Sequence, residues 1–343
     1  SGTLDYALDF DLEKLGLWKG ASFYIKARSG YSDGINPDKV GALFNTNADA
    51  FEDEPILVRK WWYEQKLLDG KIELQIGRIQ SHKDHFDVSL YANHEDKDFL
   101  NQLSTRNLTI PHQNGIGVFA KVAPVDWWYV QAAAIDAQVG KRTRTGFDTA
   151  FRGEAWYNVF FETGFLPKWK TSRGPMPGSY RIGLWYDPRV QPIFMNTLDG
   201  RRRQRYRGND VGFYVGFDQM IWKENHDPDD EQGLGIFARW GASHRDINQV
   251  AHYWQVGASY RGLISGRDDD VLGFAVSQAI LSRKYREEVN EDADRETVWE
   301  WYYQIQLTPW CTIAPDFQVI QNPGGDKTDR DAIVGGVRVF ITF

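Results

Sequence analysis

Residues 211–218 read VGFYVGFD, and the pattern of these eight residues indicates the fold class. Every second residue is apolar, namely Val211, Phe213, Val215 and Phe217. Glycine, tyrosine and aspartate fill the positions between them, and the run ends at Asp218. Because successive side chains of a β-strand point to opposite faces of the sheet, the alternation predicts a strand with one apolar face and one polar face.

The same alternation recurs along the whole chain and predicts an all-β protein. We expect 15 strands, near residues 2–12, 21–30, 56–68, 71–79, 115–123, 126–136, 154–165, 178–187, 209–222, 233–243, 252–262, 270–279, 296–307, 312–321 and 331–343. Most are about 9–12 residues long, which suits a tilted strand that crosses a membrane, whereas strands of soluble domains have ~5–6 residues. The sequence therefore predicts a transmembrane antiparallel β-barrel that forms a single domain over residues 1–343.

The two faces of the predicted strands differ in a way that fits a membrane. The apolar face often ends in Trp or Tyr, as at Trp254, Tyr260 and Trp299, and such residues form girdles at a bilayer interface. The opposite face carries Gly, Gln and charged residues, for example Arg261 and Glu300. The dry core of a sandwich could not hold so many charges without a large desolvation cost. A water-filled lumen could hold them, so we expect the polar face to line a pore.

The connections between the predicted strands alternate in length. Short turns lie near Asp69, Pro124 and Pro309. Longer polar stretches occupy residues 31–55, 80–114, 137–153, 188–208, 244–250 and 280–295. Short turns on one side and long loops on the other are typical of a bacterial outer-membrane barrel.

The strand count is odd, whereas bacterial single-chain barrels have even numbers of strands. The first turn, at residues 13–20, is in phase with the short turns, so the first strand begins on the long-loop side. We therefore expect one further strand upstream of Ser1, which would complete 16 strands; an overlooked strand is the alternative. The chain starts without Met or an apolar leader, so a signal peptide is absent or already removed.

Composition and motifs argue against several other classes of protein. With 47 acidic and 40 basic residues the net charge is -7, which argues against a nucleic-acid binder. The single cysteine, Cys311, excludes a disulfide scaffold. His82 and His85 superficially resemble a metal pair, but no helical spacing or further ligand supports a metal site or any other cofactor. No nucleophile elbow is present, so we predict no catalytic residue and no enzyme.

Several local patterns resemble the carbohydrate-selective porin family, of the OprB type. The similarity is spread over nearly the whole chain and is carried by residues 8–20 (LDFDLEKLGLWKG), 51–54 (FEDE), 63–65 (YEQ), 74–78 (LQIGR), 86–93 (FDVSLYAN), 99–101 (FLN), 314–325 (APDFQVIQNPGG) and 334–338 (VGGVR). Its most specific part pairs Pro-Asp-x-Gln with Asn-Pro-Gly-Gly near the end of the chain. The missing first strand is a departure from the family pattern.

The resemblance implies a 16-stranded outer-membrane barrel whose eyelet is narrowed by loops folded inward. It implies passive diffusion of sugars, with arginines and carboxylates at the eyelet binding sugar hydroxyls, and neither catalysis nor energy coupling. The expected partners are outer-membrane lipid, lipopolysaccharide and the transported sugars. Phe343 looks like the C-terminal signal read by the barrel-assembly machinery. The family resemblance suggests homotrimers or monomers.

Strand parity selects the charged residues expected to face the lumen. The eyelet candidates are Lys26, Arg28, Lys60, Glu64, Lys121, Arg181, Arg239, Arg261, Glu300, Asp316 and Arg338, and Glu162 and Asp218 share their parity. Arginine suits an eyelet because its fixed fork of donors can bridge two neighbouring hydroxyls. The alternative for each residue is an ordinary salt bridge between adjacent strands. Lys26, Arg28, Lys60 and Glu64 are the better candidates, because their strands flank the loop at 31–55.

Two loop features and two rival functions complete the sequence-based expectations. Residues 94–103 predict a short helix that folds into the barrel as a plug, with a cap over the rim as the alternative. The basic run at 201–207 could attract anions or lipopolysaccharide phosphates, or could be a solvated loop or a subunit contact. The rival functions are a general or anion-preferring porin and a structural, anchoring barrel.

Overall fold

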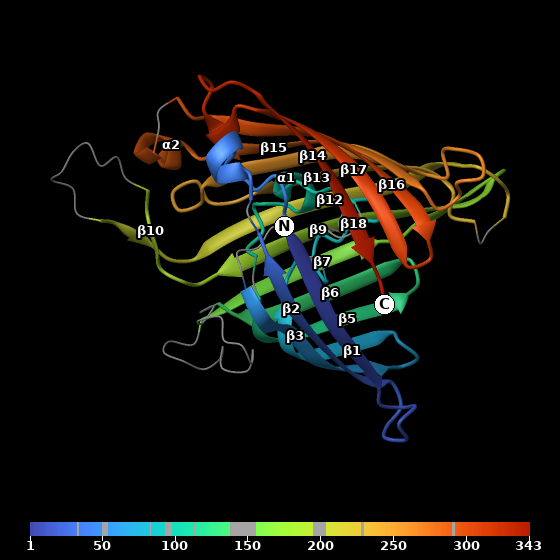
Figure 1. Ribbon diagram of the computed structural model, residues 1–343. Helices are drawn as coiled ribbons and strands as arrows, with labels where there is room; N and C mark the ends of the chain where they lie inside the picture. The colour runs from blue at the N-terminus through green and yellow to red at the C-terminus, as the bar shows by residue number, and fades with distance from the viewer. Residues whose placement is uncertain are drawn as a thin grey trace.

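The fold is described from a computed structural model of the chain (Figure 1). The structure describes residues 1–32, 34–49, 54–82, 84–92, 98–112, 114–137, 156–194, 204–227, 230–289 and 292–343. Within these residues one 16-stranded sheet dominates, and 15 of its strands follow one another in a continuous antiparallel order. The helix α2 (Arg283–Val289) and the short strand β10 (Gln191–Pro192), which belong to two of the connections, lie at one end of the barrel, on the left of Figure 1.

The strands agree with the alternating segments of the sequence. They are β1 (Gly2–Asp11), β2 (Ala21–Tyr31), β3 (Glu54–Leu67), β4 (Ile72–Gln80), β5 (Asn114–Val125), β6 (Trp128–Asp136), β7 (Tyr157–Phe165), β8 (Lys168–Thr171), β9 (Gly174–Asp187), β10 (Gln191–Pro192), β11 (Tyr206–Arg207), β12 (Asp210–Lys223), β13 (Gly233–Ala242), β14 (Val250–Arg261), β15 (Val271–Leu281), β16 (Arg295–Thr308), β17 (Cys311–Gln321) and β18 (Ala332–Ile341). Each of the 15 predicted strands has its counterpart, so the predicted fold class is confirmed.

Three short strands were not predicted. β8 pairs with the first residues of β9, which begins at Gly174 rather than at the predicted residue 178. β10 and β11 form a separate two-residue ladder in the connection before β12. β1 and β18 are the two ends of the strand order, and no pairing between them is found in the described residues. The expectation of a further strand upstream of Ser1 stays a prediction.

The outer face of the sheet is apolar and carries aromatic residues near both ends of the strands. Leu184, Val211 and Val256 are each about half exposed, as lipid-facing side chains are in an isolated barrel. Trp240 lies opposite Trp254, whose indole Nε1 donates to the side chain of Gln278 at 3.0 Å. Buried or interfacial indoles usually find such an acceptor. None of the helices in the described part of the chain has the length and apolar content needed to span a bilayer.

Glycines on the inner face make room for large aromatic rings of the neighbouring strand. A Cβ on Gly183 would lie 2.1 Å from Cζ of Tyr214, and one on Gly212 would lie 2.2 Å from the ring of Trp185. Both aromatic side chains are almost fully buried against the barrel wall. The glycines of the polar face therefore keep the inner wall flat enough for rings to lie across it.

Two long connections, the one between β2 and β3 and the one between β4 and β5, fold inward and pack on this wall; we call them the inward segments. The segment after β2 contains the π-helix η1 (Asn36–Val40), and its Phe44 packs with Val298 and Ile320. In the connection after β4, Phe86 and Ile110 pack in one buried cluster, and Ala92 and Phe99 in another. Fully burying one Phe stabilises a fold by about 1.5–3 kcal/mol, so these anchors hold the segments firmly inside.

The helices differ from the predicted one in position. α1 spans only Gln102–Thr105, so the predicted helix at 94–103 is wrong in its bounds; residues 93–97 lie outside the described part of the chain. The side chain of Asn101 caps α1 by accepting from the amide of Leu103, which fixes its start. A second helix, α2 (Arg283–Val289), and a 3₁₀ turn, η2 (Pro323–Gly325), lie in other connections and were not predicted.

Candidate functional site

The hydrogen-bond register places every charged candidate on one inner face of the sheet. Asp5 lies opposite Arg28, and Lys26 lies opposite Lys60. The same face continues strand by strand through these facing pairs: Glu73 and Lys121, Gln131 and Glu162, Gly216 and Arg239, Gln255 and Ser277, Ala275 and Glu300, Tyr302 and Asp316, and Ala314 and Arg338. Shared orientation does not give these residues a shared environment, because the inward segments cover part of this face.

One set of charges stays in contact with solvent, on β1–β3 and the inward segments beside them. We call Asp5, Lys26, Arg28, Asp49, Lys60 and Asp84 the open charged group; their side chains are 11–27% exposed. Arg28 donates through Nε to Asp5 at 2.5 Å and through Nη1 to Asp49 at 2.7 Å. Lys26 Nζ lies 2.7 Å from the same Asp5, which therefore holds two cations.

The second part of this group joins the wall to the other inward segment. Lys60 Nζ donates to both carboxylate oxygens of Asp84 at 2.7 Å. Next to it, the rings of Tyr24 and Trp62 stack with centroids 4.6 Å apart. The open charged group holds three cations and three carboxylates, so its formal charge is zero. It offers a passing solute alternating donors and acceptors.

Two other candidates lie on the same wall, nearer the short turns. Glu64 contacts Lys66 at 3.0 Å and accepts from the side-chain amide of Gln75 at 2.8 Å. Lys121 Nζ lies 5.0 Å from the ring centroid of Tyr129. These charges are partly exposed and are paired with their strand neighbours rather than with an inward segment.

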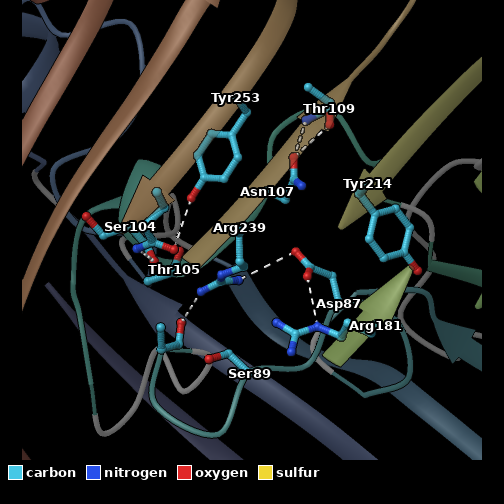
Figure 2. Close-up of polar contacts among 12 residues, drawn as sticks. Asp87, Ser89, Ser104, Thr105, Asn107, Thr109, Arg181, Tyr214, Arg239 and Tyr253 are labelled. Atoms are coloured by element: carbon cyan, nitrogen blue, oxygen red, sulfur yellow. Dashed lines mark hydrogen bonds and ion pairs between the residues drawn. The ribbon is translucent and has the colours of Figure 1, made fainter. Parts of the chain in front are cut away.

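A second set of charges is covered by the inward segments. We call Glu162, Arg181, Asp218, Arg239 and Glu300 the covered group; each residue is at most 3% exposed. Arg181 donates to Asp87 at 3.1 Å and to Asp218 (Figure 2 shows the Asp87 contact). Asp218 also accepts from the hydroxyl of Ser89. Both Asp87 and Ser89 belong to the inward segment, so this part of the wall holds that segment in place.

Arg239 and Glu162 bind the backbone of the same segment. Arg239 donates to the carbonyl oxygen of Ala92 at 2.7 Å. It also lies 3.7 Å from Asp87, a contact that Figure 2 shows. Glu162 accepts from the amide of Asp87 at 2.8 Å and from the hydroxyl of Tyr214 at 2.8 Å. Ionised groups that are buried in this way need several good hydrogen bonds to offset their desolvation, and the segment supplies them.

The remaining wall charges hold the stretch around α1. Glu300 accepts from the amides of Leu100 at 2.5 Å and Asn101 at 3.0 Å. Arg338 donates to the carbonyl oxygen of Asp98 at 2.6 Å. Asp316 is 7% exposed and accepts from the side-chain amide of Gln318 at 2.8 Å.

Arg261 and the basic run lie away from both groups. Arg261 is at the end of β14 and pairs with Glu231 and Asp269 in two short turns, with its side chain 38% exposed. Residues 201–203 of the basic run lie outside the described part of the chain. Arg207, the last residue of that run, lies 3.7 Å from Asp246 on the long-loop side.

Sequence reasoning missed three carboxylates of the open charged group. Asp5 has the correct parity on β1 and could have been found from the alternation. Asp49 and Asp84 lie in connections, where no period indicates the direction of a side chain. Only packing of the inward segments brings them to Arg28 and Lys60.

The histidines of the second connection are packed against the wall. The ring of His85 stacks on Phe119 with centroids 4.1 Å apart. Burial lowers the pKa of His85 to about 4, partly opposed by the neighbouring carboxylate of Asp84. Among the residues that the structure describes, no three His, Cys, Asp or Glu side chains converge as possible metal ligands.

Comparisons with known proteins agree with this arrangement. Porin B of Pseudomonas aeruginosa is 23% identical over 97% of this chain and 79% of its own length. The putative porin QuiX of Acinetobacter baylyi is 20% identical over 100% of this chain and 83% of its own length. The high-pH structure of Pseudomonas putida OprB shares the fold, with a TM-score of 0.86 at 21% identity over 99% of this chain and 87% of that one.

The family comparison covers the whole sequence. Residues 1–343 match the family model described as carbohydrate-selective porin, OprB family. Such a match indicates an outer-membrane channel rather than an enzyme. The chain belongs to the carbohydrate-selective porin family, OprB.

Proposed function

We propose that the protein is a passive outer-membrane diffusion channel for carbohydrates or small neutral polar solutes, with the open charged group lining its eyelet. The observation that carries this proposal is the charge balance of that group, in which Asp5, Asp49 and Asp84 offset Lys26, Arg28 and Lys60. Family membership supports the sugar as the solute.

Paired charges suit a neutral polyol for a physical reason. A sugar hydroxyl can both donate and accept, so it can exchange hydrogen bonds with the carboxylates and cations of each ion pair. Arg28 presents a planar fork of donors that is already oriented by two carboxylates. The contacts are partly exposed to water, so binding is weak enough for the solute to leave again.

The rival functions differ in what they require of the same wall. An anion-preferring porin needs an excess of cations over carboxylates at the eyelet. The open charged group has equal numbers of both. A structural barrel needs no solute path at all. Contacts with lipopolysaccharide, a homotrimeric assembly and reading of the exposed Phe343 by the barrel-assembly machinery remain predictions.

The experiment that tests the proposal is solute entry into liposomes that contain the purified protein. Glucose is compared with two charged solutes of similar size, the anion gluconate and the cation glucosamine. We expect glucose to enter fastest and to saturate, with both charged solutes slower. Faster entry of gluconate would support the anion-preferring alternative, and no entry of any solute would support the structural barrel.

A further inference from the structure

Residues 43–49 of the inward segment after β2 connect β16 with β1 and β2. At β16, the fully buried carboxylate of Glu296 accepts from the amides of Leu43 at 2.6 Å and Phe44 at 3.3 Å. At β1 and β2, Asp49 accepts from Arg28 at 2.7 Å and from Thr3 at 3.3 Å. Since β1 and β18 are the two ends of the strand order, this segment bridges the ends of the sheet.

The stretch between these two attachments is fixed at each step. The carbonyl oxygen of Thr46 accepts from the side-chain amide of Gln318 on β17 at 2.9 Å. The amide of Ala48 donates to the carbonyl oxygen of Leu100 in the other inward segment at 2.7 Å. Phe44 is buried in the same cluster as Val298, two residues from Glu296 along β16. A displacement at Glu296 would therefore be transmitted along a short and closely held path to Asp49.

Glu296 has the features of a residue that holds backbone in place. Besides the amides of Leu43 and Phe44, it accepts from the amide of Gly324 at 2.9 Å, in the turn between β17 and β18. One carboxylate thus joins three segments of chain through charge-assisted hydrogen bonds, which are about twice as strong as neutral ones. It lies behind the segment, fully buried, and does not face the solvent-exposed part of the lumen.

We propose that Glu296 is a positioning residue for the eyelet. By holding the amides of Leu43 and Phe44 it keeps Asp49 on Arg28, and Asp49 is one of the three carboxylates that balance the open charged group. Loss of this hold shifts the stretch that carries Asp49 and weakens its contact with Arg28. Arg28 is then less well compensated, and the eyelet gains an effective positive charge. The inference rests on the proposed function for its effect on sugars, but its effect on ion selectivity stands independently.

A double-mutant cycle tests this proposal in planar bilayers. The K⁺/Cl⁻ permeability ratio, from the reversal potential in a salt gradient, is measured for the wild type, Glu296→Gln, Asp49→Asn and the double variant. Removing one eyelet carboxylate is expected to lower the ratio about twofold. We expect Glu296→Gln to shift the ratio in the same direction, and the double variant to shift it no further than Asp49→Asn alone, because both changes act through one carboxylate.

A matched control separates positioning from general loosening of the barrel. Glu162 is an equally buried wall glutamate, but it holds the amide of Asp87 in the other inward segment. We therefore expect the effects of Glu162→Gln and Asp49→Asn on the permeability ratio to add. A wild-type ratio in folded Glu296→Gln, or additive effects with Asp49→Asn, would overturn the proposal.

Two further readouts keep the test decisive. If Glu296→Gln does not reach the heat-modifiable folded form, Glu296→Asp replaces it in the cycle; this variant keeps the charge but shortens the reach, so a smaller shift in the same direction is expected. Glucose block of the current is recorded in parallel. If glucose has no effect on the wild type while the ion cycle behaves as expected, the proposed function fails and the positioning role of Glu296 stands.

Discussion

The open and covered groups carry the same residue types on the same face of one sheet, yet their surroundings differ. Arg28 and Arg181 each contact two carboxylates, one on the wall and one on an inward segment. The side chain of Arg28 is 11% exposed, whereas that of Arg181 is 0% exposed. Position on a strand therefore determines whether a residue faces the lumen, while the inward segments determine whether that residue contacts water.

The largest expected effect comes from removing the buried arginine. Arg181→Met leaves Asp87 and Asp218 buried without their shared cation, which costs about 3–5 kcal/mol in the free energy of unfolding. Urea unfolding of the purified barrel in detergent or lipid, followed by the heat-modifiable band, measures the loss.

Arg261 offers the matched control for that substitution. It also contacts two carboxylates, but its side chain is 38% exposed at the short-turn end. Because exposed ion pairs contribute little, Arg261→Met should cost less than about 1 kcal/mol. Equal losses for the two variants would contradict the greater stabilisation that we assign to the buried contacts of Arg181.

A smaller effect is expected from pH, through His85. Its pKa is about 4 in the folded protein and 6.5 in the reference state, so the unfolded chain binds a proton first as the pH falls. Stability is then unaffected above about pH 6.5 and declines between pH 6.5 and 4, by about 2 kcal/mol on going from pH 7 to 5. His85→Phe keeps an aromatic ring on Phe119 and should remove this part of the pH dependence. Unfolding curves of the wild type and of His85→Phe are measured at pH 7 and at pH 5. An equal loss of stability in both proteins on going from pH 7 to 5 would contradict the burial of His85.

Substitutions in the open charged group should have the smallest effect on the free energy of unfolding and should act mainly on ion selectivity. Lys60→Met leaves Asp84 uncompensated and should raise the K⁺/Cl⁻ permeability ratio about twofold, whereas Asp84→Asn should lower it by a similar factor. Both variants should unfold within about 1 kcal/mol of the wild type, because the pair is partly exposed. Shifts in the same direction, or none, would show that this pair does not lie at the constriction.

The alternation of apolar and polar residues was sufficient to predict the sheet. The period of two places Val211 and Asp218 on opposite faces, and the register of β12 with β9 and β13 agrees with it. Boundaries were less certain, since β9 starts earlier than its periodic part, where β8 pairs with it. The same period correctly marked Lys26 and Arg181 as lumen-facing, which is all that parity can determine.

The covering of the wall could not be predicted, because it depends on connections without a period. The sequence around Asp49 and Asp84 has no alternation that gives a side-chain direction, and the predicted helix at 94–103 shows how weak local patterns are there. Burial of Phe44, Phe86 and Phe99 against distant strands fixes these segments through contacts that are remote in sequence. Tertiary packing therefore divides the charged candidates into open and covered groups.

Cysteine accessibility distinguishes the open charged group from the covered wall, because Cys311 is the single native cysteine and Cys311→Ser gives a background without reactive thiols. Lys60→Cys places a thiol in the open charged group, and Ser277→Cys places one at a fully buried wall position facing Ser104 of α1. We predict that a charged, water-soluble thiol reagent modifies the first rapidly and reduces current, that glucose slows this reaction, and that the second is not modified in the folded barrel. Equal modification of both, or no protection of the first by glucose, would contradict the assignment of the solute path to the open charged group.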